Sequence, residues 1–181
     1  MKVVGICGSP RRGNTEWILR RLLEVAANNG AEHELILLRK KDIRGCNGCL
    51  ACEVGGKERR GVCTIRDDMQ SIYPTLIDAD CLVFGTPVYF EMLSGLLKNF
   101  IDRTCPVWPR LERKLFAGIA VAEEGWGKAV DNLRTYCTVC GMRWGGYITA
   151  LAKAPGQVSE DVIVEKKIQQ LASKLIRMLN I

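Results

Sequence analysis

The chain is predicted to fold as an open parallel β-sheet covered by helices on both faces. Short apolar runs alternate with amphipathic helical segments along all 181 residues, and no linker or internal repeat divides them. The apolar runs are continuous, without polar residues at every second position, as in strands that are buried on both faces of a parallel sheet. With 48% apolar residues, one domain of this length can bury such a core.

Five strands and five helices are expected in alternation. The expected strands are 2–7, 33–38, 81–85, 115–122 and 142–150, and the expected helices are 15–28, 67–78, 93–103, 128–140 and 160–178. Trp17, Ile18 and Leu22 have the spacing of one helix face, which supports the first helix. Asp67 and Asp68 are expected in the first turn of the second helix, where carboxylates suit the helix dipole.

Composition and charge exclude several classes of function. The net charge of +6 is modest, and neither a basic face with interleaved aromatic residues nor a known nucleic-acid-binding module is present. No segment approaches the roughly 18–20 apolar residues of a membrane span. The first apolar run ends at Cys7 and is followed by Arg11 and Arg12, which is not the pattern of a secretory signal. We therefore expect a cytoplasmic protein that binds neither nucleic acid nor membrane.

Four cysteines stand close together between the second expected strand and the second expected helix. They are Cys46, Cys49, Cys52 and Cys63. Three thiols spaced by two residues, with a fourth further along, form the ligand pattern of a cuboidal iron–sulfur cluster. Crowded thiolates repel one another unless a metal centre takes up their charge. Zinc, a disulfide and unligated loop cysteines remain alternatives; the disulfide is the weakest because nothing indicates an oxidising compartment.

The loop after the first strand has the composition of an anion-binding site. It contains Ser9, Arg11, Gly13, Asn14 and Thr15, directly before the first helix. Backbone N–H groups at a helix N-terminus bind phosphate, and hydroxyl, amide and guanidinium donors strengthen such a site. The glycine spacing matches neither G-x-G-x-x-G nor a P-loop. An ordinary capped helix with surface arginines is the alternative.

Two further loops are expected at the same edge of the sheet. Pro87, Val88, Tyr89 and Phe90 follow the third strand and are expected to form either a wall for a flat ring system or a buried turn that packs against the core. Glu124, Gly125 and Trp126 follow the fourth strand, in a loop that is expected either to close this site or to be a flexible connection. A phosphate loop beside a ring-binding loop is what a mononucleotide requires.

These motifs, in this order, resemble the flavodoxin-like NADPH-dependent FMN reductase superfamily. They are GSPRRGNT at 8–15, DDM at 67–69 and DCLVFGTPVYFEMLSGLLKNFIDRT at 80–104. The similarity covers about residues 2–150, and the cysteine-rich insertion at about 44–66 resembles that of the iron–sulfur flavoproteins of anaerobes. Ten residues separate Cys52 from Cys63, which is longer than the spacing of that family.

The resemblance implies a fold, two cofactors and their ligands. The fold is a flavodoxin-like three-layer sandwich over a single domain, 1–181, whose five parallel strands have the order 2-1-3-4-5. Members bind FMN and a 4Fe–4S cluster, pass electrons between them, and form homodimers or homotetramers. By resemblance, Ser9, Arg11, Gly13, Asn14 and Thr15 would hold the FMN phosphate, Pro87, Val88, Tyr89 and Phe90 would line the isoalloxazine, and Cys46, Cys49, Cys52 and Cys63 would ligate the cluster.

The expected function is that of an FMN-dependent oxidoreductase or electron carrier. Flavin supplies the chemistry, so no side chain is assigned a catalytic role. A cluster-free NAD(P)H-dependent FMN or quinone reductase and a non-catalytic flavin redox sensor are the alternatives. The donor is expected to be ferredoxin or NAD(P)H, and an acidic protein donor would dock on the basic clusters at 39–41 and 57–60.

The remaining cysteines are expected to be structural. Cys7, Cys81 and Cys105 fall in apolar segments and are predicted to be small buried side chains. Cys137 and Cys140 form a second C-x-x-C pair, but they close a helix rather than open one, so the helix dipole does not favour a thiolate.

Overall fold

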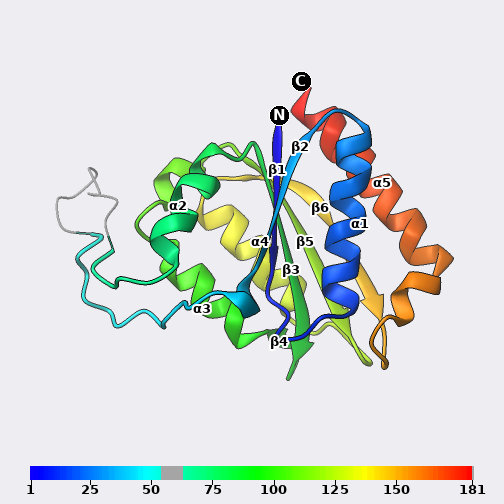
Figure 1. The fold of residues 1–181 in the computed structure, drawn as a ribbon, viewed down its shortest axis with the longest axis horizontal. Coiled ribbons are helices and arrows are strands. Elements are labelled where there is room, and N and C mark those ends of the chain that lie inside the picture. Colours follow the sequence, from blue (N-terminus) through cyan, green and yellow to red (C-terminus); the bar gives the residue numbers. More distant parts are fainter. Residues whose placement is uncertain (54–62, 181) are drawn as a thin grey trace.

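A parallel sheet forms the centre of the molecule, with helices packed on both of its faces (Figure 1). The computed structural model describes residues 1–53 and 63–180. The parallel strands have the order β2-β1-β3-β5-β6, and the short strand β4 pairs antiparallel with β3. Counting the parallel strands alone, this is the predicted order 2-1-3-4-5, which is confirmed.

The strands and helices alternate as expected. The strands are β1 (Lys2–Cys7), β2 (Glu32–Leu37), β3 (Cys81–Tyr89), β4 (Met92–Leu93), β5 (Leu115–Ala122) and β6 (Arg143–Leu151). The α-helices are α1 (Asn14–Asn28), α2 (Met69–Asp78), α3 (Gly95–Arg103), α4 (Ala129–Val139) and α5 (Val162–Leu179). Short 3₁₀ helices span Leu38–Lys40, Trp108–Leu111 and Gln157–Glu160. Among the described residues, no helix has the length and apolar character that crossing a bilayer requires.

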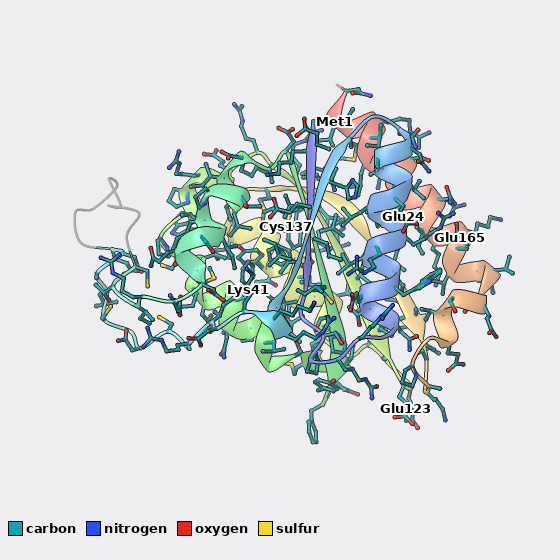
Figure 2. All side chains as sticks on the ribbon, viewed as in Figure 1. Met1, Glu24, Lys41, Glu123, Cys137 and Glu165 are labelled. Carbon is teal, nitrogen blue, oxygen red and sulfur yellow. The ribbon has the colours of Figure 1, made fainter. Side chains whose placement is uncertain are left out.

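Each face of the sheet has its own apolar core. Helices α1 and α5 cover one face, and α2, α3 and α4 cover the other (Figure 1). Every residue of β5 is buried, as expected for a central parallel strand. On the α2–α4 side, Phe84 packs edge-on against Phe100 and Phe116. Cys137 lies within this core (Figure 2), and its burial agrees with the structural role predicted for it.

Several element boundaries were predicted wrongly, among them the end of β3 and the start of α2. Strand β3 continues to Tyr89, where a loop was expected, because Tyr89 pairs with Met92 of β4. Phe90 and Glu91 form the two-residue turn between them, with φ of 49° and 61°. Such turns usually contain Asn or Gly, so this one carries no sequence signal. Helix α2 begins at Met69, so the expected helical positions of Asp67 and Asp68 are also wrong.

The loop after β1 is fixed tightly against its neighbours. The N–H of Gly8 donates to the carbonyl of Gly85 at 2.8 Å, and the Ser94 hydroxyl donates to the carbonyl of Gly8 at 2.6 Å. A Cβ atom at Gly8 would lie 2.6 Å from the Cβ of Leu97, so only glycine fits this position. These contacts tie the loop to β3 and to the start of α3, at the carboxyl edge of the sheet.

Candidate functional site

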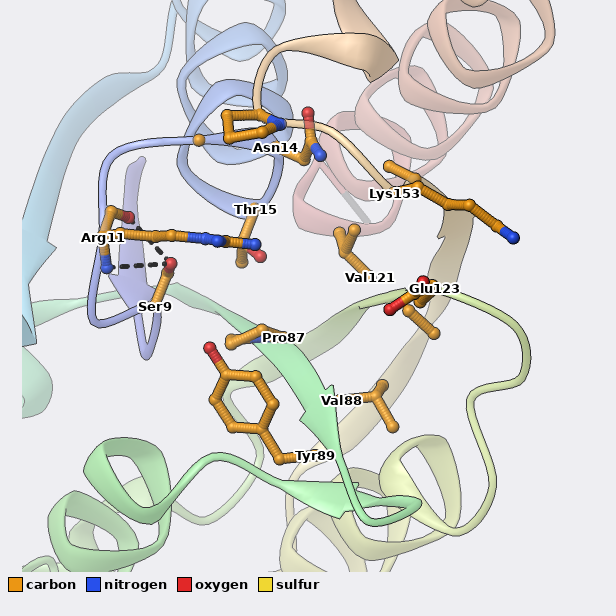
Figure 3. Close-up of a pocket in the computed structure, with 14 residues that line it drawn as sticks. Ser9, Arg11, Asn14, Thr15, Pro87, Val88, Tyr89, Val121, Glu123 and Lys153 are labelled. Atoms are coloured by element: carbon orange, nitrogen blue, oxygen red, sulfur yellow. Dashed lines mark hydrogen bonds between the residues drawn. The ribbon is translucent and has the colours of Figure 1, made fainter.

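A pocket lies at the carboxyl edge of the sheet, where the loops after β1, β3, β5 and β6 meet (Figure 3). Eight of the residues predicted to bind a mononucleotide line it. They are Ser9, Arg11, Gly13, Asn14, Thr15, Pro87, Val88 and Tyr89. Figure 3 shows Ser9, Arg11, Asn14 and Thr15 on one side of the pocket and Tyr89 on the other.

Three of the predicted cofactor residues do not line this pocket. Phe90 is fully exposed at the β3–β4 turn, and Glu124 and Gly125 are exposed in the loop after β5. The sequence prediction also missed part of the wall, namely Val121, Ala122, Glu123, Ala152, Lys153 and Pro155. These residues could have been found from their position at or just after the ends of β5 and β6, because the strand ends of a parallel sheet share one edge.

The N-terminus of α1 is open toward the pocket. Gly13 occupies the N-cap position and has no side chain to accept hydrogen bonds from the first turn. By contrast, Ser94 caps α3, accepting from the N–H of Leu97 at 3.2 Å, and Asp161 caps α5. A Cβ atom at Gly13 would meet nothing within 4 Å. The first turn of α1 therefore keeps N–H groups and space for a bound anion.

Hydrogen bonds within the chain shape the phosphate loop. The Ser9 hydroxyl donates to the carbonyl of Arg11 at 2.8 Å and closes the loop on itself. The Asn14 amide donates to the carbonyl of Ala154 at 2.8 Å, and its oxygen accepts from the N–H of Val158 at 3.4 Å. Asn14 thus ties the start of α1 to the loop after β6, while one of its two amide hydrogens is left for a ligand.

The buried carboxylate of Glu16, in the first turn of α1, forms ion pairs with two arginines. Glu16 is 3% exposed and pairs with Arg20 and Arg39, each at 2.8 Å. Burial acts to raise the pKa of Glu16, but hydrogen bonds from the two guanidinium groups hold it below its usual value. Arg39 is therefore held in a largely buried ion pair, and its expected part in docking stays a prediction. Of the other predicted docking cations, Lys40 and Lys41 are exposed, whereas Lys57, Arg59 and Arg60 lie outside the described residues.

A second pocket lies beside the far end of α3. All four predicted metal ligands border it, together with Cys105. Cys46 and Cys49 are exposed, whereas Cys52 and Cys63 are partly buried. Within 1–53 and 63–180, no three Cys, His, Asp or Glu side chains converge closely enough to hold a metal ion. The thiols thus share one pocket, and ligation would require them to draw together.

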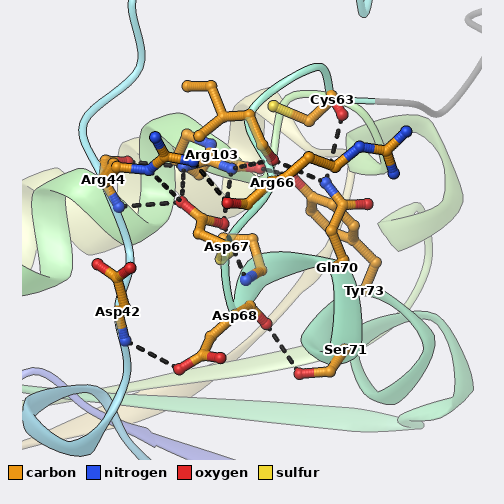
Figure 4. Close-up of polar contacts among 12 residues, drawn as sticks. Asp42, Arg44, Cys63, Arg66, Asp67, Asp68, Gln70, Ser71, Tyr73 and Arg103 are labelled. Carbon is orange, nitrogen blue, oxygen red and sulfur yellow. Dashed lines mark hydrogen bonds and ion pairs between the residues drawn. The ribbon is translucent and has the colours of Figure 1, made fainter.

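A buried ion pair closes the base of the cysteine segment (Figure 4). The side chains of Asp67 and Arg103 are 0% and 1% exposed, and their closest atoms are 2.6 Å apart. Arg103 also donates to the carbonyl of Arg44 at 2.7 Å, and Asp67 accepts from the N–H of Arg44 at 3.0 Å. Arg44 precedes the first cysteine and Asp67 follows the last, so this pair joins the two ends of the segment.

Further hydrogen bonds fix the residues just before and just after the cysteine segment (Figure 4). The N–H of Asp42 donates to the Asp68 carboxylate at 2.8 Å, and the N–H of Asp68 donates to the carbonyl of Asp42 at 3.0 Å. The Gln70 amide donates to the carbonyl of Cys63 at 3.2 Å. The two described ends of the cysteine segment are therefore anchored to α2 and α3.

Cys105 does not have the environment that the sequence predicted. It is partly buried at the cysteine pocket, and its thiol lies 3.8 Å from the carboxylate of Glu53. Burial raises the pKa of the Cys52 thiol to about 11, and a hydrogen bond with the Cys105 thiol acts in the same direction. Cys7 and Cys81, by contrast, are fully buried as expected. The prediction for Cys105 was wrong because its neighbours come from a distant part of the chain.

The cysteine pocket has the features of a site for an anionic group. Arg103 borders it, and the buried Nε of this residue has no hydrogen-bond partner among the described residues. An unpaired buried donor is costly unless a ligand satisfies it. A hydrogen bond with Thr64 lowers the pKa of the Cys49 thiol, which favours the thiolate that a metal requires. The sulfur ligands and the nearby cation both suit an iron–sulfur cluster.

Comparisons with known proteins agree with this geometry. The family model described as NADPH-dependent FMN reductase matches residues 1–154. The chain is 32% identical to an iron–sulfur flavoprotein of Methanocaldococcus jannaschii, over 100% of this chain and 98% of that protein. It is 34% identical to an iron–sulfur flavoprotein of Archaeoglobus fulgidus, over 97% of this chain and 79% of that protein. A solved flavodoxin from the domain Archaea has a TM-score of 0.67 over 100% of both chains, and its 12% identity makes it evidence for the fold alone.

Replacing Asp67 with Asn should destabilise the protein by about 3–5 kcal/mol, because it leaves the Arg103 charge buried without its partner. Burial acts to raise the pKa of Asp67, but hydrogen bonds from Arg103 hold it below its usual value. The stability due to this pair is therefore present above the ordinary aspartate pKa of about 3.9 and lost as the pH falls through the folded-state value. Urea unfolding at several pH values measures both effects.

The matched control is Asp102→Asn. Asp102 adjoins Arg103 but forms an exposed pair with Lys98, so its loss should cost less than about 1 kcal/mol. Equal unfolding free energies for the two variants would show that the ion pair of Asp67 and Arg103 does not stabilise the fold.

Proposed function

This chain belongs to the NADPH-dependent FMN reductase family, and so is an FMN-dependent oxidoreductase; we propose that it also carries a 4Fe–4S cluster and exchanges electrons between the two cofactors. The observation that carries the proposal is the cysteine pocket, which four predicted ligands and Arg103 border, and the buried Nε of Arg103 has no hydrogen-bond partner among the described residues. The names of the two archaeal relatives support it.

The residues around the first pocket suit FMN. The open N-terminus of α1 and the cation of Arg11 would bind the phosphate, and Ser9 and Thr15 would add hydroxyl donors. Tyr89, Pro87 and Val88 offer a flat and largely apolar wall for the ring system. FMN supplies, when bound, redox chemistry in one- and two-electron steps that side chains lack.

In the cysteine pocket, Cys46, Cys49, Cys52 and Cys63 would be the ligands of the cluster. A 4Fe–4S cluster supplies one-electron transfer, at a potential that nearby charges and hydrogen bonds tune. The ion pair of Arg103 and Asp67 would keep a donor and a positive charge beside the sulfurs. Helix α3 connects the two sites, since Ser94 before its first residue contacts the phosphate loop and Arg103 at its end borders the cysteine pocket.

Arg11→Ala should weaken FMN binding about 10- to 100-fold, because it removes one charge-assisted hydrogen bond from the phosphate. Arg12→Ala is the matched control: Arg12 is the exposed neighbour of Arg11 but does not line the pocket. Titration of the apoprotein with FMN, followed by flavin fluorescence, gives both dissociation constants. An equal effect of the two substitutions would place the phosphate elsewhere.

Cys46→Ser should abolish the cluster and leave FMN bound, since Cys46 belongs to the cysteine pocket alone. The test is the iron, sulfide and flavin content of anaerobically purified protein, with its absorption spectrum. Cys140→Ser, which removes a thiol that is buried in the core and does not border this pocket, should change none of these. If wild type and both variants contain FMN without iron, the protein is a cluster-free FMN reductase.

We further propose that an acidic electron donor such as ferredoxin, if it serves in place of NAD(P)H, docks near the cysteine segment. Lys40, Lys41, Arg44 and Arg66 are exposed there. Screening weakens attraction between surface charges, so reduction by such a donor should slow as salt is added. Lys41→Glu should slow reduction by this donor at low salt. Lys174→Glu is the matched control, because it makes the same charge change on α5, on the opposite side of the molecule (Figure 1). Equal rates for the two variants would contradict this docking site.

A further inference from the structure

Cys105 is presented to the cysteine pocket by a rigid turn after α3. The N–H of Thr104 donates to the carbonyl of Ile101 at 3.0 Å, and the Thr104 hydroxyl donates to the same carbonyl at 2.7 Å. The buried hydroxyl of Tyr136 donates to the Thr104 hydroxyl at 3.0 Å. The backbone and the side chain of Thr104 are thus both fixed. This limits where the thiol of the next residue, Cys105, can lie.

The Cys105 thiol lies beside Cys52, the third cysteine of the C-x-x-C-x-x-C motif at 46–52. It is within hydrogen-bonding reach of the Cys52 thiol and lies 3.8 Å from the carboxylate of Glu53. Cys46 and Cys49, the other two members of the motif, border the same pocket. Cys105 is therefore as well placed to bind a metal in this pocket as a cysteine of the insertion, although it follows helix α3.

Cys63 has different neighbours. Its carbonyl accepts from Gln70, and its thiol faces Tyr73 and Arg103 and packs against the apolar core under α2. The hydroxyl of Tyr73 donates to the carbonyl of Arg103 at 2.9 Å, so these neighbours are themselves fixed. Ligation by Cys63 would require its thiol to leave these contacts, whereas Cys105 already touches the thiol of Cys52.

A 4Fe–4S cluster takes four thiolate ligands, and this pocket offers five. We propose that Cys105 is an additional ligand of the cluster site and can take the coordination position assigned to Cys63. The inference rests on the proposed function, because it presupposes the cluster. In the exchange, the incoming thiol loses its proton on binding iron and the departing thiolate gains one, so neither an oxidant nor a reductant is consumed.

Substitution of the two cysteines, singly and together, tests the proposal. Cys63→Ser and Cys105→Ser should each retain most of the iron and sulfide found in the wild type, whereas the double variant should lose nearly all of it. Cys63→Ser combined with Cys140→Ser is the matched control, since Cys140 is buried in the core and does not border the pocket; it should behave as Cys63→Ser alone. Iron and sulfide per FMN, together with the electron paramagnetic resonance spectrum of the reduced protein, measure occupancy without relying on activity.

Two outcomes would overturn the proposal about Cys105 without refuting the presence of the cluster in the wild-type protein. Loss of the cluster in Cys63→Ser to the same extent as in the double variant would make Cys63 indispensable. Retention of the cluster in the double variant would show that neither residue supplies the fourth ligand. A wild-type protein without iron or sulfide would refute the proposed function, and the inference with it. Circular dichroism and FMN binding identify any variant that fails to fold.

Labelling with iodoacetamide gives a second measurement that needs only one substitution. A thiolate bound to iron is shielded from alkylation, so Cys105 should react slowly in anaerobic, cluster-containing Cys63→Ser protein and rapidly after the cluster is removed. Mass spectrometry of peptides locates the label. Equal labelling of Cys105 before and after removal of the cluster would contradict its role as a ligand.

Discussion

The ion pair between Asp67 and Arg103 joins the residues on either side of the cysteine segment to the end of helix α3. Both side chains are almost completely buried, and their closest atoms are 2.6 Å apart. Burying two charges is costly, and the cost is offset only when geometry and further hydrogen bonds are good. Here Asp67 also accepts from the N–H groups of Arg44 and Met69, and Arg103 donates to the carbonyl of Arg44. The pair thereby fixes where the chain leaves the fold and where it returns.

Helix α3 extends this constraint to the flavin side of the molecule. It has nine residues and is therefore about 13 Å long. Ser94 caps its start and donates to Gly8 in the phosphate loop, while Arg103 ends it at the cysteine pocket. One short rigid element thus sets the distance between two sites that lie far apart in the sequence. A fixed separation of this kind would suit electron transfer between two cofactors bound at these sites.

The regular fold and most of the lining of the pocket at the sheet edge could be predicted from the sequence, because both follow from local patterns. Apolar runs identified the strands, and the rule that parallel strand ends share one edge brought Ser9 and Tyr89 to the same pocket. Contacts between distant segments could not be predicted in this way. Asp67 fitted a helix dipole in the sequence, but its partner Arg103 lies 36 residues further along. Cys105 likewise showed no relation to the cysteine run until the fold placed it beside Cys52.

The central claim is that one chain of this family holds both a flavin and an iron–sulfur cluster. The most direct measurement is the metal, sulfide and flavin content of wild-type protein purified without oxygen. The account predicts FMN together with iron and acid-labile sulfide in equal amounts, in the ratio to FMN that one 4Fe–4S cluster per chain requires. FMN accompanied by zinc, or by no metal, would contradict it.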